Sequence, residues 1–338
     1  MGLDSNLRQI LAETSNFSLA KSTWSSYRTA KRQWDKFGQE TGSVTTLPTT
    51  QDIALSFTAW LLNRGVGTST IKTYLAGLRQ AHLSQGLNPP KLHSDLTSQV
   101  LQGKFNLDNL ERIKQRKPAR LPVTITLLKI LRLELKKTSL HPTDQKLLWA
   151  VSLIAFSRAF RPGELLTSKE WRFDAAVNLL RKDIKKTSIT LEGETVPILQ
   201  IKLKAEKQNK KGGFNLVDVY GSGGKLCPFQ AFEEWEKAAP PSARSGPAFC
   251  RHNGAALTKS YFNKVLKLTL QKHTEGLNGF ISGHSFRIGI ASLLGTLGHH
   301  ESDIMAAGRW SSNAYSSYLK LPRTKRLFIA RQISSTLS

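Results

Sequence analysis

The sequence predicts a two-domain, mainly α-helical protein with one small antiparallel β-sheet. Three observations lead to this prediction. The chain has 338 residues, which favours two domains over one. Apolar residues recur at helical spacing along most of the chain. Strand-like alternation of apolar and polar residues is confined to residues 188–220, which indicates a single sheet in the second half.

The first hundred residues predict a small helical bundle. Residues 18–38 carry an aromatic stripe with a basic flank, which is typical of an amphipathic helix. Threonine caps at the start and glycines at the end predict further helices within 49–65 and 68–86. His82 faces inward in the second of these, and residues 94–110 predict a fourth helix.

Residues 111–124, ERIKQRKPARLPVT, predict a basic linker, because they include two prolines and few apolar side chains. Beyond the linker, alternation over 188–204 and 214–220 predicts strands around a turn at 205–213. Helices are expected before and after these strands in the sequence, over residues 124–136, 143–158, 228–238, 258–272, 284–297 and 311–319.

The charge of the chain indicates a polyanionic partner. There are 49 Lys and Arg against 24 Asp and Glu, a net charge of +25, of which +6 falls in residues 1–116 and +19 in residues 117–338. An excess of positive charge in both halves points most simply to nucleic acid. An acidic membrane surface is the alternative, but no basic amphipathic helix with an aromatic face stands out. No apolar run has transmembrane length and no signal-peptide core is evident, so no membrane partner is expected.

The sequence offers no pattern for a metal or another cofactor. Cys227 and Cys250 have neither zinc-site spacing nor the numbers for a disulfide framework, which favours a reducing compartment. Cys227, within LCPF, is expected to be a small buried side chain. There is no phosphate-binding P-loop, no HExxH helix and no paired-carboxylate site. We therefore expect no cofactor.

The stretch SGHSFRIGIASLLGTLGHH, residues 282–300, places two basic side chains where a helix dipole disfavours cations. His284 and Arg287 lie at i and i+3 near the first turn of a predicted helix. A bound anion would explain the pair, because first-turn N–H groups, a guanidinium and a histidine donor all bind anions. Taken alone, the stretch favours the alternative, an exposed pair on an ordinary amphipathic helix.

Several motifs occur in a fixed order in the second half. They are AFRPGELL, a lysine in the predicted hairpin turn, HSFR, GRW, and a tyrosine eight residues beyond the tryptophan. In this order they resemble the catalytic domain of the tyrosine recombinases, the integrase family of DNA strand-transferring enzymes, and the N-terminal bundle resembles the core-binding domain of that family. The resemblance spans roughly residues 15 to 335. GRWSSNAYSSYL and LCPFQAF look most like recombinases of eukaryotic mobile elements, the Crypton and DIRS-like groups.

The resemblance implies a C-shaped clamp on DNA. Its parts are a core-binding domain over 1–110, the basic linker 111–124, a catalytic domain over 125–322 and a tail helix over 323–338. The implied reaction is metal- and ATP-independent cleavage and exchange of DNA strands through a covalent 3′-phosphotyrosine, for integration or excision of a mobile element. The implied partners are double-stranded DNA and further copies of the chain, as a tetramer on two duplexes. A eukaryotic element would place the protein in the nucleus.

The tail has two possible docking places. Apolar side chains between basic ones predict a short amphipathic helix over 324–334. Such a helix either packs on its own domain or inserts into a partner. The resemblance implies that it docks on a neighbouring subunit.

The resemblance also assigns the groups that bind the scissile phosphate. Arg161 and Arg287 grip its non-bridging oxygens, where planar guanidinium groups suit the charge that develops during in-line attack. His284 donates a hydrogen bond to the same phosphate or helps to deprotonate the nucleophile. The scissile phosphate is then the anion that the His-x-x-Arg pair faces.

The lysine of the hairpin turn resembles the residue that protonates the departing 5′ oxygen. Lys207 is the first choice for this role. Lys204, Lys210 and Lys211 lie nearby and remain alternatives, although contact with DNA is the role expected of them.

The nucleophile is expected to be a tyrosine near the C-terminus, because a phenol leaves readily when the strand is resealed. Tyr318 resembles it in its position after GRW. Tyr315 lies three residues earlier on the same helical face, so geometry alone does not choose between the two. Tyr315 is expected to be a packing residue.

Supporting residues complete the predicted site. Many members of the family have a second histidine where this chain reads GRW. Trp310 fills that place, or Arg309 if the spacing is counted strictly, and an indole N–H can still bond a phosphate. Glu164 is expected to steady the arginines or the start of a helix. DNA contacts are expected from the bundle, the linker and the hairpin turn, through Lys72, Arg79, Lys114, Arg116, Lys117, Arg120, Lys210 and Lys211. Thr70 and Thr73 of the bundle could also meet phosphates. For any one of Thr70, Lys72, Thr73 and Arg79 alone, plain solvated surface is the favoured alternative.

Two other functions remain open. The chain could be a recombinase-derived DNA-binding protein that has lost catalysis, although the complete set Arg161, His284, Arg287 and Tyr318 argues against this. It could also be a type IB topoisomerase, which uses the same chemistry to relax DNA. Assembly into oligomers on DNA separates a recombinase from a topoisomerase.

Overall fold

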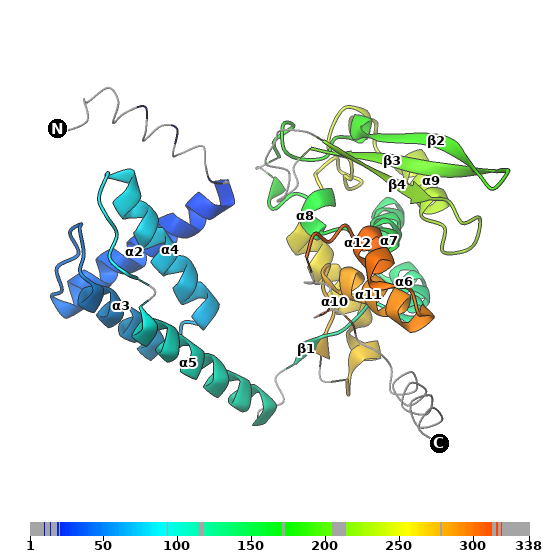
Figure 1. The fold of residues 1–338 in the computed structure, drawn as a ribbon. Helices are drawn as coiled ribbons and strands as arrows, with labels where there is room; N and C mark the ends of the chain where they lie inside the picture. The colour runs from blue at the N-terminus through cyan, green and yellow to red at the C-terminus, as the bar shows by residue number, and fades with distance from the viewer. Residues whose placement is uncertain are drawn as a thin grey trace, which may run out of the picture. The chain divides into compact units, whose positions relative to one another are not determined.

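The computed structural model describes residues 10, 14, 19, 21–92, 94–114, 118–170, 173–204, 214–277, 279–312, 316 and 319, apart from the side chains of residues 21, 22 and 112–114. The chain forms two compact units, Met1–Arg116 and Lys117–Ser338. The boundary between them falls within the predicted linker. Figure 1 shows both units, each of which is described by itself.

The first unit is a bundle of helices α2 (Lys21–Thr41), α3 (Gln51–Asn63), α4 (Thr68–Ser84) and α5 (Asp95–Lys114). Aromatic rings fill its core: Trp34 and Phe57 meet edge to face with centroids 5.0 Å apart, and both are buried. Helices α2 and α4 cross closely at Gly77, where a Cβ atom would lie only 2.9 Å from the Cβ of Ala30. The aromatic stripe seen in the sequence is therefore the face that holds the bundle together.

His82 is buried in this core, as its position on the helix predicted. Its Nδ1 lies 2.8 Å from the carbonyl oxygen of Leu78, and its Nε2 lies 3.0 Å from the backbone nitrogen of Thr49. A carbonyl only accepts and a backbone N–H only donates, so the ring carries its proton on Nδ1. The histidine thereby ties the segment before α3 to α4.

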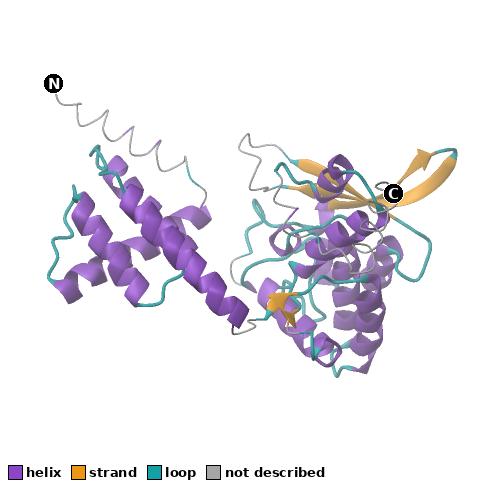
Figure 2. Ribbon diagram, turned by 60° about the horizontal axis from the view of Figure 1, so that its bottom comes forward, coloured by secondary structure: helices purple, strands orange, loops and turns teal. Residues whose placement is uncertain are grey.

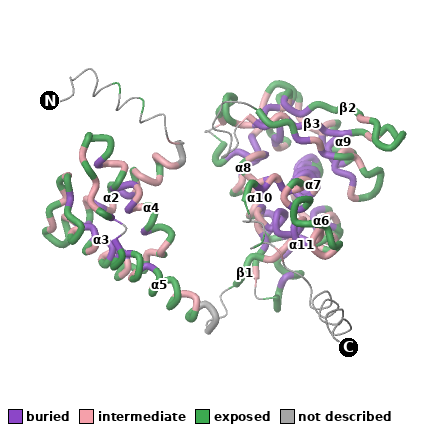
Figure 3. The backbone as a smooth tube through the Cα atoms, viewed as in Figure 1, coloured by how far each residue is buried: buried purple, intermediate pink, exposed green. Residues whose placement is uncertain are grey.

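The second unit packs helices around the buried helix α7 (Pro142–Ser157), in which every residue from Leu147 to Phe156 is buried (Figure 3). A three-stranded antiparallel sheet covers one side (Figure 2), with strand order β2-β3-β4. Its strands and the remaining helices are β2 (Ile184–Leu191), β3 (Glu194–Leu203), β4 (Asn215–Tyr220), α6 (Ile125–Lys137), α8 (Pro162–Leu165), α9 (Pro228–Ala238), α10 (Lys259–Thr274), α11 (Ser285–Leu297) and α12 (Glu301–Gly308). The mainly helical architecture with one small antiparallel sheet matches the predicted fold class.

The segment 111–124 is not a free linker over its whole length. Its first four residues belong to the last turn of α5, and Ala119–Arg120 form strand β1, which pairs in parallel with β5 (Gly279–Phe280). The N–H of Val123 donates to the carbonyl of Ser285 at 3.0 Å. These bonds join residues about 160 positions apart, so no local pattern revealed them. The predicted linker therefore overlaps α5 at its start and β1 near its end.

The sheet also differs from the prediction. Strand β2 begins at Ile184, and the stretch 188–204 contains a two-residue turn at Glu192-Gly193 that divides it into two strands. Both turn residues have positive φ, 49° and 85°, as a tight hairpin turn requires. Helix α12 was not predicted, because its eight residues give too short a pattern. Most of the predicted helix over 311–319 lies outside the described residues.

Candidate active site

Three segments of the second unit meet at the predicted site. They are the turn from α7 into α8, the loop into α11 and the end of α12. A Cβ atom on Gly283 would lie 2.5 Å from Pro162 Cγ, so the first two segments touch. The N–H of Gly283 donates to Asn263 Oδ1 of α10 at 2.7 Å, which fixes the loop that carries His284.

Glu164 links two arginines of the site. Its Oε2 accepts from the backbone N–H of Arg161 at 2.7 Å, and its Oε1 accepts from Arg161 Nη1 at 2.9 Å. Arg309 Nη2 lies 2.8 Å from Glu164 Oε2, although it is 145 residues away in the chain. The carboxylate is 6% exposed, while Arg161 keeps 30% of its side chain exposed. Glu164 therefore holds Arg161 in place and leaves part of its surface open to an anion.

Arg309 and Trp310, the two candidates for the second-histidine place, both lie at the site but do different things. Arg309 adopts a left-handed conformation with φ 53°, and its guanidinium lies 4.6 Å from the ring centroid of Phe160. Trp310 is buried, and the guanidinium of Arg287 lies 4.7 Å from its ring centroid. A Cβ atom on Gly308 would overlap the indole, so only glycine allows this packing. Arg309 is thus linked to Arg161 through the Glu164 carboxylate, whereas Trp310 packs against the guanidinium of Arg287.

Arg287 is 1% exposed. Its Nη1 donates to the carbonyl of Ala159, which lies just before Arg161 in the chain. A charged group so deeply buried needs such partners, because an unpaired buried charge is very costly. The guanidinium is therefore held against the turn between α7 and α8, and a phosphate contact requires that one of its nitrogens become accessible.

His284 is half-buried, and its pKa is lowered to about 4. Burial is the main cause, followed by the positive charges of Arg120, Arg287 and Arg161. The imidazole is therefore neutral near pH 7, with one nitrogen to donate and one to accept. The helix start does not carry two cations as the sequence suggested, because one of the two side chains is uncharged.

Arg158 is a member of the cluster that sequence analysis missed. It follows the last residue of α7, and burial and the charge of Arg309 lower its pKa. Asp218 and Tyr220 of β4 act in the opposite direction. With Arg158, the described part of the site contains four arginines, and Glu164 pairs directly with two of them. Such an excess of positive charge suits a phosphate, and it suits even better a transition state with more negative charge.

Other predicted residues are separate from this cluster or lie outside the described residues. Lys204 forms an ion pair with Asp183 at 2.6 Å, so its ammonium is already engaged. Lys72, Arg79 and Arg120 are exposed, and Arg120 also acts on the pKa of His284. Outside the described residues are the hairpin lysines Lys207, Lys210 and Lys211, the linker residues Arg116 and Lys117, the tyrosines Tyr315 and Tyr318 and the tail 323–338. Lys114 ends α5, and nothing is described of its side chain.

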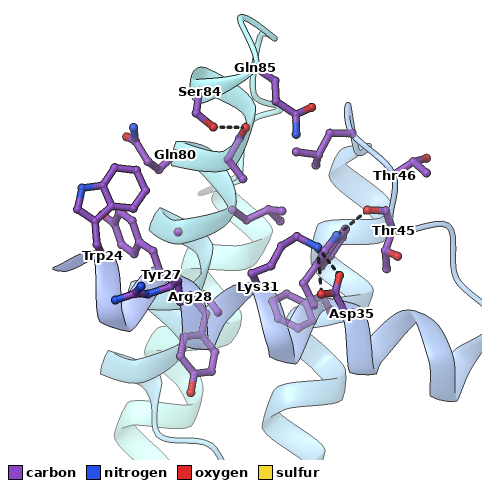
Figure 4. Close-up of a pocket in the computed structure, with 18 residues that line it drawn as sticks. Trp24, Tyr27, Arg28, Lys31, Asp35, Thr45, Thr46, Gln80, Ser84 and Gln85 are labelled. Carbon is purple, nitrogen blue, oxygen red and sulfur yellow. Dashed lines mark hydrogen bonds and ion pairs between the residues drawn. The ribbon is translucent and has the colours of Figure 1, made fainter. Parts of the chain in front are cut away.

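The first unit has two hollows between α2 and α4. One, of about 350 Å³, is lined largely by hydroxyl groups, including those of Thr70 and Thr73, two residues named in the sequence as able to meet phosphates. The other, of about 620 Å³, has aromatic walls and the ion pair of Lys31 with Asp35 at its edge (Figure 4). None of the candidate catalytic residues lines either hollow.

Neither a metal site nor a membrane-spanning helix is found in the part of the chain that the structure describes. No group of three or more His, Cys, Asp or Glu side chains there is placed to hold a metal ion. No helix of that part is both long and apolar enough to span a membrane.

Comparison with known proteins defines the fold. No protein-family model matches the sequence, and no curated protein matches it. Among solved structures, XerH site-specific recombinase on a palindromic difH substrate, in a post-cleavage complex, has a TM-score of 0.56 and 16% identity over 89% of this chain and 76% of that one. The Tn1549 transposon integrase with transposon right-end DNA has a TM-score of 0.57 and 13% identity over 96% and 98%. A lambda integrase dimer bound to a COC′ core site has a TM-score of 0.56 and 11% identity over 95% and 96%.

At these identities the likeness is one of fold. The chain has the fold of the tyrosine recombinases, and the fold expected from the ordered motifs is confirmed.

Proposed function

We propose that this protein is a DNA strand transferase that cleaves and rejoins DNA through a covalent 3′-phosphotyrosine intermediate. The observation that carries the proposal is the arginine cluster around Glu164, with a neutral His284 beside it, on a tyrosine-recombinase fold. Of the similar proteins, XerH was solved with its difH substrate after cleavage, and lambda integrase as a dimer on its core site. The net charge of +25 fits a DNA substrate.

The described residues provide the phosphate-binding half of the reaction. Arg161, preset by Glu164, binds a non-bridging oxygen, and Arg287 is its partner on the other side of the α7–α8 turn. His284 donates a hydrogen bond to the same phosphate. Donors fixed in advance stabilise the charge that builds on these oxygens during in-line attack, without reorganisation at the moment of reaction.

The covalent half of the reaction falls to residues outside the described part. The Tyr318 oxygen attacks phosphorus and loses its proton, and the bond from phosphorus to the 5′ oxygen breaks. Lys207 gives a proton to that 5′ oxygen, which leaves as a hydroxyl. In the second step a 5′ hydroxyl attacks the phosphotyrosine, the tyrosine leaves, and the DNA strand is restored.

The biological setting is part of the proposal. The chain would act in integration or excision of a mobile element of the Crypton or DIRS-like kind, in a nucleus, as a tetramer on two duplexes, without metal or ATP. The tail 323–338 would pass to a neighbouring subunit.

A covalent-adduct assay tests this function. The bound sequence is first selected from a pool of random duplexes and then built into nicked duplexes that trap the intermediate. We expect the wild-type protein to form a protein–DNA adduct that survives a denaturing gel, also in excess EDTA. Tyr318→Phe should bind this DNA as the wild type does and form no adduct, because the reacting hydroxyl adds little to binding.

Other outcomes would redirect the assignment. An adduct that persists in Tyr318→Phe and disappears in Tyr315→Phe makes Tyr315 the nucleophile. DNA binding without any adduct favours a silent DNA-binding protein. Relaxation of supercoiled plasmid by a form that stays monomeric on DNA favours the topoisomerase.

A further inference from the structure

The lysine that begins helix α10 lies against the candidate active site, and neither its motif nor its spacing marks it in the sequence. The N–H of Lys259 donates to the carbonyl of Thr167 at 2.9 Å, and the N–H of Thr167 donates to the carbonyl of Leu257 at 3.3 Å. Thr167 follows directly after the end of α8. The start of α10 is therefore tied by backbone bonds to the short helix that Arg161 begins.

The side chain of Lys259 extends toward Gly163, in the short helix α8. Its Nζ lies 3.4 Å from the position that a Cβ atom on Gly163 would take. Gly163 is exposed and lies two residues after Arg161. The Lys259 ammonium thus sits on the surface of the turn that presents the Arg161 guanidinium.

A second residue on the same face of α10 supports this placement. Asn263 follows Lys259 at i+4, so the two side chains lie on one face of the helix. Asn263 Oδ1 accepts from the N–H of Gly283, the residue before His284. One face of α10 therefore contacts both segments that carry the phosphate-binding residues.

The charge on Lys259 is not neutralised within the described part of the chain. No carboxylate there lies within ion-pair distance of its ammonium, and the residue is partly buried. The nearby carboxylate of Glu164 already bonds Arg161 and Arg309. A lysine on this turn with no carboxylate partner in the described part of the chain is available to an anion.

We propose that Lys259 binds a DNA backbone phosphate adjoining the one that Arg161 binds, and so positions the strand at the site. The inference rests on the proposed function, because it takes DNA to be the anion. A lysine suits this role as a compact point charge that needs no fixed geometry, unlike the forked arginine at the scissile phosphate.

The other role open to a lysine here is that of the proton donor to the 5′ oxygen, which we assign to Lys207. The two roles differ in a measurable way. A donor becomes dispensable when sulfur replaces the bridging 5′ oxygen, because a thiolate leaves without a proton. A phosphate-binding residue stays necessary with either atom.

The experiment compares Lys259→Gln, Lys259→Arg and the control Lys267→Gln with the wild type. Lys267 is an exposed lysine on the same helix, so its variant makes the same change of charge two turns away. For each protein, DNA affinity is measured against salt concentration. The single-turnover rate of adduct formation is then measured on nicked duplexes with 5′ oxygen or 5′ sulfur at the scissile position, and melting temperatures check the fold.

We expect Lys259→Gln to bind DNA about tenfold more weakly, in line with the loss of one charge-assisted hydrogen bond. The slope of log affinity against log salt should fall by about 0.9, the contribution of one phosphate contact. The rate should fall equally with oxygen and with sulfur. Lys259→Arg should restore most of the affinity and the slope, and Lys267→Gln should retain both.

Two results would overturn the inference. One is a Lys259→Gln protein with wild-type affinity and slope. The other is a rate defect that sulfur removes, which would make Lys259 the proton donor. If the wild type binds DNA but forms no adduct, the proposed strand-transfer function fails, while the salt slope still decides whether Lys259 contacts phosphate.

Discussion

Arg161 and Arg287, the two arginines expected to bind the phosphate, lie in opposite environments. Arg161 and Arg309 are joined by a carboxylate and remain partly exposed, at 30% and 16%. Arg287 is buried, bonded to a backbone carbonyl and stacked on Trp310. Arg161 is therefore open to a ligand as it stands, whereas Arg287 is part of the core and binds a phosphate only when one of its nitrogens becomes accessible.

The difference predicts how each arginine fails when it is replaced. A partly exposed ion pair adds little to folding, so the value of Arg161 lies in what it binds. A buried guanidinium that satisfies a buried carbonyl contributes to folding itself, because its removal leaves that carbonyl without its partner. The sequence motifs that contain Arg161 and Arg287 do not reveal this difference in role, because it depends on how deeply each side chain is buried.

The largest expected effect is on the reaction rate of Arg161→Gln. Loss of one donor to the developing oxyanion should lower the rate of adduct formation about 100- to 1,000-fold. The melting temperature should change little, since Glu164 keeps its bond to Arg309. Single-turnover gels and a thermal melt measure the two quantities. If Arg161→Gln melts far below the wild type, the bond from Arg161 to Glu164 stabilises the fold, and Arg161 does not differ from Arg287 in this respect.

The next effect is on the stability of Arg287→Gln. We expect it to lose about 1.5 to 3 kcal/mol, the range for a hydrogen bond to a charged group. For a domain of this size this corresponds to a fall in melting temperature of roughly 3 to 12 °C. Arg287→Lys keeps the charge without the planar fork and should lose part of that stability. Unchanged melting of Arg287→Gln would show that the core does not need the guanidinium, and would remove the contrast with Arg161.

Local patterns predicted the parts of the site that are local in sequence. Arg161 and Glu164 lie three residues apart around a four-residue helix, and His284 and Arg287 lie on one helical turn. The helical bundle followed from apolar spacing, because each amphipathic helix buries the stripe that its sequence shows. The fold that contains these elements is confirmed, while the roles of Arg161, Glu164, His284 and Arg287 stay predictions, as do those of Lys207 and Tyr318.

Contacts between distant segments could not be predicted in this way. The bond from Glu164 to Arg309 spans 145 residues, and the position of Lys259 depends on a backbone bond to Thr167. The burial of Arg287 likewise depends on Trp310 and on the carbonyl of Ala159, which belong to other elements. The spacing of side chains along the sequence does not predict these contacts, because they arise from the packing of whole helices against one another.

The smallest expected effect concerns His284, on which both Arg161 and Arg287 act. Its folded pKa of about 4 lies below the 6.5 of an unpaired histidine, mainly because it is buried. Between these two pH values the unfolded chain binds the proton and the folded chain does not. Stability therefore falls as the pH drops from about 6.5 toward 4, and the contribution of His284 is complete above that window.

His284→Asn should lose less stability than the wild type over the same window, in melts at closely spaced pH values. His299→Asn, a change at an exposed histidine beyond the end of α11, is the matched control and should follow the wild type. If His284→Asn and the wild type lose stability in parallel, the imidazole is not held neutral by its surroundings. Burial and the charges of Arg161 and Arg287 would then not lower the pKa of His284 together.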